Sequence, residues 1–508
     1  MRQTMASVLS AAMLLVGAGP APGAEVRPEE VKLPPWEKPE LPAFPGAEGF
    51  GAVSKGGRGG KVIKVTNLNA DGPGSLAAAC AEKGPRIVVF EVSGVIPVRN
   101  KNGLEVGDGQ LTIAGQTAPG AGVTVEGQFS CRGSKAKTKF HDVTVRFMRF
   151  RPKKGEGEHA VMFTETGRLI LDHVSCSWGN DEDMGLSMND NLTVQWCALE
   201  ESDWPGAIAE YRVKDGPWFS GGGNKPHAFG MILGYVPEGN ATLHHNLFAH
   251  HNRRTPLCGI ELLDHRNNVI YDVKEGIMFH PPDFNKSRPG QPFAANIVGN
   301  YFKEGPSCPK VKKAGEEWPS KVGGGTWLVA ESPGATHIAG NYFSTVGKVA
   351  DVWAGSVPAV SVGKCLKVEK PWPAPEVATQ SAEEAYRLVL AQSGCLPRDA
   401  VSKRTFEGVA SGGGSWGRKD PEGGLMAGLT PGKAAPDGDN DGLPDEWEKA
   451  HGLNPADPKD ANGIVPAGAS KDDRHKGYTY IEYYINELAD KLVEAAGAEA
   501  RASAAGGK

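Results

Sequence analysis

Short β-branched runs separated by Gly, Asn and Asp turns fill the sequence between the first Gly-rich turn and about residue 345, and they restrict the possible folds more than any other feature. Runs such as VIKVTNL, RIVVFEV and VTVRFMRF have no helical apolar period between them. Aligning the runs gives an internal repeat of roughly two dozen residues, with one double interval and some loop insertions. The aligned positions are Met148, Val174, Cys197, Asn246, Asn268, Asn300 and Asn341.

A repeat of this length that holds short strands and no helix predicts an all-β fold, a right-handed single-stranded parallel β-helix. Each coil stacks on the previous one, so like residues form internal ladders. Asn at a recurrent bend can bond the backbone of neighbouring coils, where buried polar groups need partners. The alternative is a β-sandwich, whose strands are also short, but a sandwich does not require a repeated residue at a fixed phase.

The N-terminus predicts export. Residues 1–24 combine a basic Arg2, an apolar core and small residues before a cleavage point after Ala24, which is typical of a signal peptide. A buried N-terminal helix is the alternative, but Pro20 and Pro22 would break it. We therefore expect a secreted protein, extracellular or periplasmic.

Composition divides the rest of the chain and excludes some partners. Residues 366–434 predict one amphipathic helix from Ser381 to Ser393, with Ser381 and Glu384 spaced as a capping box, and then a turn-rich linker. The other expected segments are a Pro-rich lead-in (25–42), the β-helix (43–365), an EF-hand-like module (435–492) and a disordered tail (493–508).

The net charge of -5 is too small to drive binding to nucleic acid or an acidic membrane, and no stretch reads as a membrane span. We expect a monomer, and the eight cysteines leave disulfide connectivity open.

The C-terminal sequence DGDNDGLPDEWE matches the spacing of an EF-hand calcium loop. The carboxylates at loop positions 1, 3, 5, 9 and 12 are Asp437, Asp439, Asp441, Asp445 and Glu448. Carboxylates spaced by two residues converge on one hard cation. We expect a single structural Ca²⁺ site here, the alternative being an acidic surface turn.

A second acidic group lies in RLILDHVSCSWGNDED. A regular strand turns Asp172 outward, and Asp181, Glu182 and Asp183 follow on the next loop. Four carboxylates on one outer face repel one another and need solvent or a cation, and oxygen ligands of this type suit Ca²⁺. A solvated acidic turn is the alternative.

A third group, in LHHNLFAHHNRRTP, places four His and two Arg within a short stretch. The adjacent Arg pair and the lack of nearby Cys or carboxylate argue against zinc. A basic patch beside an acidic cluster favours a site for an anionic substrate, because arginine grips carboxylates through its planar fork.

Four ordered blocks of the sequence resemble the pectate lyases of the parallel β-helix type, polysaccharide lyase family 1 and its bacterial relatives. The blocks are AFPGAEGFGAVSKGGRGGKVIKVTNLNADGPGSL, TIAGQTAPGAGVTVEG, LILDHVSCSWGNDED and HHNLFAHHNRRTP. The resemblance implies a secreted enzyme that cleaves pectate, an acidic polysaccharide of α-1,4-linked galacturonate, by β-elimination assisted by Ca²⁺.

The resemblance also implies roles for individual residues. Calcium ligands would be Asp172, Asp181 and Asp183, with Glu182 as a further candidate. Arg254, the first residue of an Arg-x-Pro motif, would be the catalytic base. The family often has a second Arg three residues after this proline, where this chain has Gly259. Substrate binding is then assigned to Arg253, Lys225 or His227.

In the implied reaction, Ca²⁺ binds the uronate carboxylate, the adjacent C5–H becomes more acidic, and Arg254 takes the proton. Arginine is ordinarily charged, so this role needs a nearby positive charge and predicts a high operating pH. Two alternatives stay open. A β-helix glycoside hydrolase of the polygalacturonase type would use two of Asp172, Asp181 and Asp183 as acid and base, and a secreted β-helix could bind polysaccharide without catalysis.

Overall fold

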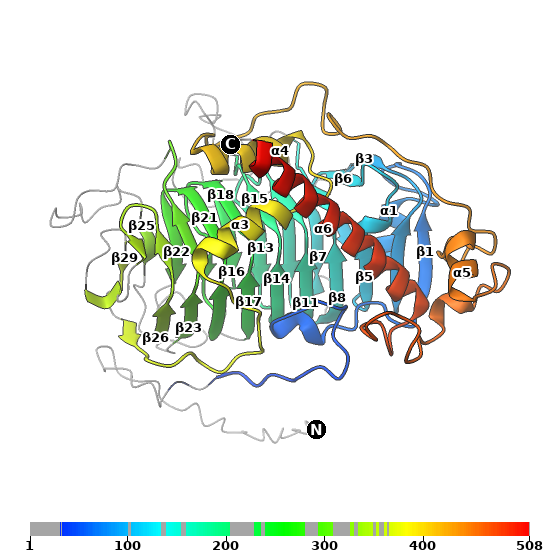
Figure 1. The fold of residues 1–508 in the computed structure, drawn as a ribbon, viewed down its shortest axis with the longest axis horizontal. Coiled ribbons are helices and arrows are strands. Elements are labelled where there is room, and N and C mark those ends of the chain that lie inside the picture. The colour runs from blue at the N-terminus through cyan, green and yellow to red at the C-terminus, as the bar shows by residue number, and fades with distance from the viewer. Residues whose placement is uncertain are drawn as a thin grey trace, which may run out of the picture.

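The chain folds as the predicted parallel β-helix, shown by a computed structural model in Figure 1. The structure describes residues 31–506 except 32, 100–102, 134–138, 154–158, 204–227, 235–238, 280–292, 308–325, 330–333, 349–351, 355–359 and 363–364. From β2 to β27, consecutive strands fall in sheets A, B and C in turn, so each coil adds one strand to each sheet. Among the described residues, every pairing between named strands is parallel except that of β27 with β28.

Sheet A has eleven strands: β1 (Lys61–Val65), β2 (Arg86–Phe90), β5 (Leu111–Ala114), β8 (Phe140–Arg146), β11 (Thr166–Asp172), β14 (Asp190–Gln195), β17 (Asn240–His244), β20 (Leu262–Arg266), β23 (Phe293–Val298), β26 (Gly334–Ala339) and β30 (Cys365–Lys367). Sheet B has ten: β3 (Gly94–Pro97), β6 (Val123–Glu126), β9 (Arg149–Phe150), β12 (Ser175–Ser177), β15 (Ala198–Glu200), β18 (Leu247–His251), β21 (Val269–Val273), β24 (Tyr301–Lys303), β27 (Tyr342–Phe343) and β28 (Gly347–Lys348). Sheet C has nine: β4 (Leu104–Val106), β7 (Phe129–Arg132), β10 (Val161–Thr164), β13 (Glu182–Ser187), β16 (Phe229–Leu233), β19 (Leu257–Cys258), β22 (Glu275–Phe279), β25 (Thr326–Val329) and β29 (Val360–Ser361).

The predicted ladder lies at the bend between sheets A and B. Asn246, Asn268, Asn300 and Asn341 are buried, and each of the first three donates its amide to the Oδ1 of the next, at 2.9, 3.2 and 3.0 Å. All seven residues just before the aligned positions have a positive φ, which turns the chain sharply at each coil: Phe147, His173, Trp196, His245, Asn267, Gly299 and Gly340. The recurrent Asn therefore satisfies buried backbone at a repeated bend, as predicted.

Apolar side chains from all three sheets fill the interior of the coils in one continuous core. Several cysteines belong to it, among them Cys131, Cys176 and Cys197. All seven cysteines among the described residues are free. They pack as small apolar side chains.

Helices cover the outside of the coils. In the described part of the chain they are α1 (Leu76–Ala81), α3 (Ala382–Gln392), α4 (Ala400–Ser411), α5 (Asp445–His451) and α6 (Tyr480–Gly506), with short 3₁₀ turns η2 (Phe50–Val53), η3 (Gly115–Thr117), η5 (Val352–Ala354) and η6 (Asp460–Asn462). The expected helix is α3, and the hydroxyl of Ser381 caps it by accepting the Glu384 amide at 3.2 Å. Val389 of α3 and Phe406 of α4 pack on sheet B. Sequence reasoning missed α4, although Asp399 and Gly412 mark its two ends.

The expected disordered tail is wrong over almost all of its range, because α6 continues to Gly506. The sequence after residue 492 is rich in Ala, which favours helix. Its first turn also has a partner, since Val493 and Ala496 pack beside Phe147 and Leu396. In Figure 1, α6 runs obliquely across the strands.

Within the described part of the chain, no helix combines the length and the apolar character needed to cross a membrane. The predicted signal peptide lies outside the described residues.

Candidate active site

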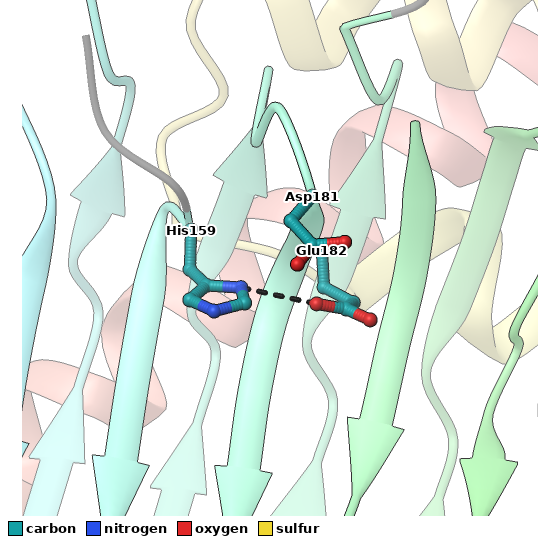
Figure 2. Close-up of side chains that lie close together, drawn as sticks. All are labelled: His159, Asp181 and Glu182. Carbon is teal, nitrogen blue, oxygen red and sulfur yellow. Dashed lines mark ion pairs between the residues drawn. The ribbon is translucent and has the colours of Figure 1, made fainter. Parts of the chain in front are cut away.

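Four candidate side chains lie at one edge of sheet C, where its strands begin. His159 precedes β10, Asp181 and Glu182 lie at the start of β13, and Arg254 precedes β19. Because parallel strands of one sheet start at the same edge, residues far apart in sequence become neighbours there. Figure 2 shows His159, Asp181 and Glu182 pointing toward one another from two coils.

Glu182 is the centre of this group. Its side chain is 1 % exposed, and its Oε1 accepts a hydrogen bond from Nη1 of Arg254. Its Oε2 lies 3.2 Å from Nδ1 of His159. Ligand atoms of His159, Asp181 and Glu182 all lie within 4.8 Å of one another. A buried carboxylate is thus held between an arginine and a histidine, next to a second carboxylate.

Arg254 is fixed by the strands on both sides of it. Its carbonyl accepts the Met231 amide at 2.7 Å, and the next amide, of Thr255, donates to Gly276 at 3.0 Å. The guanidinium lies 4.0 Å from the centroid of the Phe229 ring. Its side chain keeps 20 % exposure, so the base predicted from sequence is anchored and still reaches solvent.

Arg253 lies beside it and is more exposed, at 35 %. Its Nε donates to Oε2 of Glu275, the first residue of β22, at 2.5 Å. The position of the missing second Arg, Gly259, has no room for a side chain, because a Cβ there would lie 2.7 Å from the carbonyl of Gly234. Three residues were predicted to bind substrate. Arg253 is the one of them that lies in the described part of the chain, and it is at this edge.

The turn before Asp181 is held by the C-terminal extension. Nε1 of Trp178 donates to Glu201 at 3.2 Å, and Nε of Arg404, on α4, donates to the same carboxylate at 2.7 Å. The guanidinium of Arg418 lies 4.2 Å from the centroid of the Trp178 ring. Gly179 allows the turn to close, since a Cβ there would lie 2.1 Å from the Glu182 carbonyl. The segment expected to be a linker therefore packs against the loop that carries the acidic residues.

Asp172 lies on the outer side of sheet A, as predicted, opposite the core residues Leu169 and Leu171, but chain segments that cover this side bury it. It ends β11 in sheet A and is 1 % exposed. Its carboxylate accepts from Nε of Arg146 at 2.8 Å and from Gln195 at 2.9 Å. Burial alone would raise the pKa of this carboxyl, but His173 and Arg146 outweigh burial and hold it well below its usual value. Asp172 is a structural ion-pair partner and not a member of the acidic cluster.

Asp183 also lies apart from the cluster, although it follows Glu182 directly. Successive side chains of a strand point to opposite faces, so Asp183 points away from the face that carries Glu182 and is 0 % exposed. Its Oδ1 accepts the Gly179 amide at 2.8 Å. Burial nevertheless raises the pKa of the Asp183 carboxyl well above its usual value. Asp183 is not among the residues whose ligand atoms converge with those of Glu182.

The histidines of the third group are buried and form no basic patch: His244, His245, His250 and His251 are at most 1 % exposed. Burial lowers the pKa of His251 to about 3 and that of His245 to about 4, so both are neutral. The accessible positive charge of this segment lies on its two arginines, Arg253 and Arg254, whose side chains are 35 % and 20 % exposed. The other predicted substrate residues, Lys225 and His227, lie outside the described residues.

The predicted C-terminal loop brings its first three carboxylates together. Ligand atoms of Asp437, Asp439 and Asp441 lie within 4.8 Å of one another. Asp445 begins α5, and its Oδ1 accepts the Gly438 amide at 2.7 Å, so it braces the loop. Glu448 lies on α5 and is fully buried.

Known proteins resemble this chain along most of its length. It is 33 % identical over 469 residues to a probable pectate lyase C of Aspergillus fumigatus, covering 88 % of this chain and 94 % of that protein. The chain belongs to the pectate lyase family. The corresponding protein of Emericella nidulans is 30 % identical over 465 residues, covering 88 % and 93 %. Family membership confirms the prediction from sequence of a pectate lyase of the parallel β-helix type.

Solved structures share less sequence with this pectate lyase. The major cedar pollen allergen jun a 1 has 18 % identity and a TM-score of 0.43, over 69 % of this chain and 93 % of its own. The pectate lyase Bsp165PelA of Bacillus sp. N165, in complex with trigalacturonate, has 17 % identity and a TM-score of 0.43, over 69 % and 98 %. No protein-family model matches the chain.

Sequence reasoning found most of the residues at this edge of the pectate lyase but missed two. His159 stands alone in sequence, two residues before a strand, and no local pattern marks it. Glu275 lies on the coil next to that of Arg253 and pairs with it. The periodicity of the coils was the available signal, since it places the residues that precede β10, β13, β19 and β22 at one edge.

Proposed function

We propose that this secreted pectate lyase cleaves α-1,4-linked galacturonan by β-elimination, with Arg254 as the base and Asp181 and Glu182 as Ca²⁺ ligands. The observation that carries the proposal is the meeting of Arg254 with Glu182, His159 and Asp181 at one strand edge, in a chain of this family. Export to the cell exterior or periplasm and action as a monomer are part of the proposal. Recovery of the protein outside the cells that express it tests export. Light scattering on the recovered protein tests whether it is a monomer.

The residues at this edge fit a calcium ion. Asp181 and Glu182 offer carboxylate oxygens, which are the ligands Ca²⁺ prefers, and the ligand atoms lie close enough to share one ion. His159 orients Glu182 from the other side. When bound, Ca²⁺ would neutralise the uronate carboxylate and acidify the adjacent C5–H.

The chain's own side chains perform the remaining steps. Arg253 is positioned by Glu275 and binds a substrate carboxylate through its guanidinium. Arg254, supported by the Phe229 ring, takes the proton from C5. The electron pair of the C5–H bond forms the C4–C5 double bond, the C4–O bond breaks, and the departing oxygen is protonated by water. Because arginine must lose its proton to act as a base, activity rises toward alkaline pH.

The two alternatives find less support in the geometry. The predicted hydrolase would use two of Asp172, Asp181 and Asp183, and both Asp172 and Asp183 are buried with other partners. A protein that only binds polysaccharide would not need Arg254 against a buried carboxylate.

The test is ultraviolet absorbance on mixing the protein with polygalacturonate at alkaline pH, with Ca²⁺ and then with excess chelator. A lyase gives a Ca²⁺-dependent rise from the conjugated double bond, and Arg254→Ala loses it by about 10³-fold or more while binding of polygalacturonate is retained. Arg99→Ala is the matched control, because Arg99 is 78 % exposed and pairs with Asp71. New reducing ends without absorbance would replace this proposal by hydrolysis, and binding without either product by a binding protein.

A further inference from the structure

We propose that the loop from Asp437 to Glu448 binds its own Ca²⁺ ion, and that this ion clamps helix α6 against the first coils of the β-helix. The site is separate from the strand edge that carries Arg254. It lies on the outer side of sheet A, near β1 and β2, whereas the active-site residues precede strands of sheet C. In Figure 1, α5 lies beside the end of the molecule that holds β1.

The first observation is the convergence of three carboxylates in the loop. The backbone holds them in place, since the amides of Asn440 and Gly442 donate to Asp437 at 2.8 and 2.9 Å. Gly442 has a φ of 95°, which an L side chain rarely adopts, and its turn lets the chain wrap around one point. The loop is thus bent as a chelating loop requires.

The second observation is Glu448, at position 12 of the loop. It is 0 % exposed, and both of its carboxylate oxygens are buried without a hydrogen-bond partner. A buried carboxylate without partners is costly unless it is paired or ligates a metal. A bidentate Glu at this position is what a Ca²⁺ loop supplies.

The negative charge of the carboxylates in this loop exceeds the positive charge that Lys64 supplies. Nζ of Lys64 lies 3.0 Å from Oδ2 of Asp437, but it also pairs with Glu91 at 2.6 Å. One ammonium shared between two carboxylates does not compensate Asp439, Asp441 and Glu448. A divalent cation would compensate them, and oxygen ligands select Ca²⁺ over transition metals.

The loop is also the joint between α6 and the β-helix. Leu443 is fully buried between Ile87 and Val89 of β2 and Ile481 and Ile485 of α6. Beyond the loop, Oδ2 of Asp441 accepts the Ala461 amide at 3.1 Å. An ion that closes the loop therefore fixes the position of Leu443, and the apolar contacts of Leu443 hold α6 on sheet A.

A second contact ties the end of the loop to α6. Trp447, next to Glu448, donates to Glu487 at 2.7 Å, and its ring lies edge-on to Tyr483 and Tyr484. Movement of Glu448 on loss of the ion is transmitted to α6 through this ring.

The experiment is calorimetric titration of the full chain with Ca²⁺, together with amide hydrogen exchange with and without chelator. It uses a Glu182→Gln background, so that binding at the active site does not contribute. We expect this variant to retain one Ca²⁺ site, and Ca²⁺ to slow exchange in residues 437–453 and 480–492. Loss of all Ca²⁺ binding in this background, or an equal effect of Mg²⁺, would overturn the proposal.

Two ligand variants and one control complete the test. Glu448→Gln and Asp439→Asn weaken Ca²⁺ binding by about tenfold or more and lose the Ca²⁺-dependent rise in unfolding temperature. Glu446→Gln lies on the same helix, is 84 % exposed and leaves both unchanged. Unchanged affinity in both ligand variants would show that the loop is only an acidic turn. Asp439 is only partly buried, so its variant stays informative if Glu448→Gln does not fold.

Discussion

Neighbouring carboxylates in this pectate lyase differ in chemistry because their side chains point in different directions. Glu182 and Asp183 are adjacent, yet one meets Arg254 and His159 while the other is buried on the opposite face of the strand. Burial raises the pKa of the Asp183 carboxyl well above its usual value. A single residue of register thus separates a candidate ligand from an interior group.

His159 supports the proposed Ca²⁺ ligand Glu182 and is predicted to tune metal affinity. Replacing it in His159→Ala removes the group 3.2 Å from Oε2 and lets the carboxylate reorient. We expect the Ca²⁺ concentration for half-maximal elimination to rise about tenfold. The measurement is absorbance against Ca²⁺ concentration. His141→Ala serves as control, because His141 is 48 % exposed, and an unchanged Ca²⁺ requirement in His159→Ala would remove this role.

Asp172 is predicted to matter for stability and not for calcium. Asp172→Asn leaves Arg146 without its buried counter-charge and should cost about 3 kcal/mol of unfolding free energy. Its pKa is held below the unfolded value of about 4, so the stabilisation is present above that pH and is lost as the pH falls through the folded-state value. Urea unfolding across a pH series tests this: the gap between wild type and variant should shrink in acid. A changed Ca²⁺ requirement for elimination would instead return Asp172 to the ligands.

Among the structural elements, the bend between sheets A and B is the feature that repeats most regularly. Each positive-φ residue turns the chain, and the next residue points into the core. Side chains before the bends also stack from coil to coil, with ring centroids 4.5 Å apart for Phe147 and His173 and 4.2 Å apart for Trp196 and His245. The bends therefore fix the register of the strands that begin at the active-site edge.

The Asn ladder is predicted to be a main source of this order. Asn268→Ala removes the amide that bonds Asn300 and Leu243, and the oxygen that accepts from Asn246. Leaving buried groups without partners should cost about 3 kcal/mol. Thermal unfolding measures the loss, with Asn462→Ala as control, because Asn462 makes one exposed bond to Gly60. Equal unfolding temperatures would show that the ladder is not a stabilising element.

Across the whole molecule, the C-terminal third is a brace on the outside of the coils. α3 and α4 pack on sheet B, α6 packs on sheet A, and Arg404 and Arg418 reach the turn before Asp181. The chain after the β-helix thus supports the active-site loop from behind.

Truncation after residue 492 is predicted to destabilise the protein, because Val493 and Ala496 pack near Phe147 and Leu396. Loss of these contacts should cost about 1 to 3 kcal/mol. Differential scanning calorimetry measures the shift, and truncation after residue 506 is the control. A truncated protein with wild-type unfolding temperature would show that this part of α6 contributes no stability.

The amino-acid pattern alone determined the coil repeat, the Asn ladder, α3, the Arg-Thr-Pro motif and the spacing of the C-terminal loop, because each depends on residues near one another in sequence or at a fixed period. The tertiary structure decided which carboxylates face Arg254. His159, Glu182 and Arg254 come from three coils, and Asp172 takes Arg146 as its partner instead. It also decided that the last helix is ordered. The physical reason is that the direction of a side chain and its burial depend on contacts between coils, and these form only when the whole helix of strands is stacked.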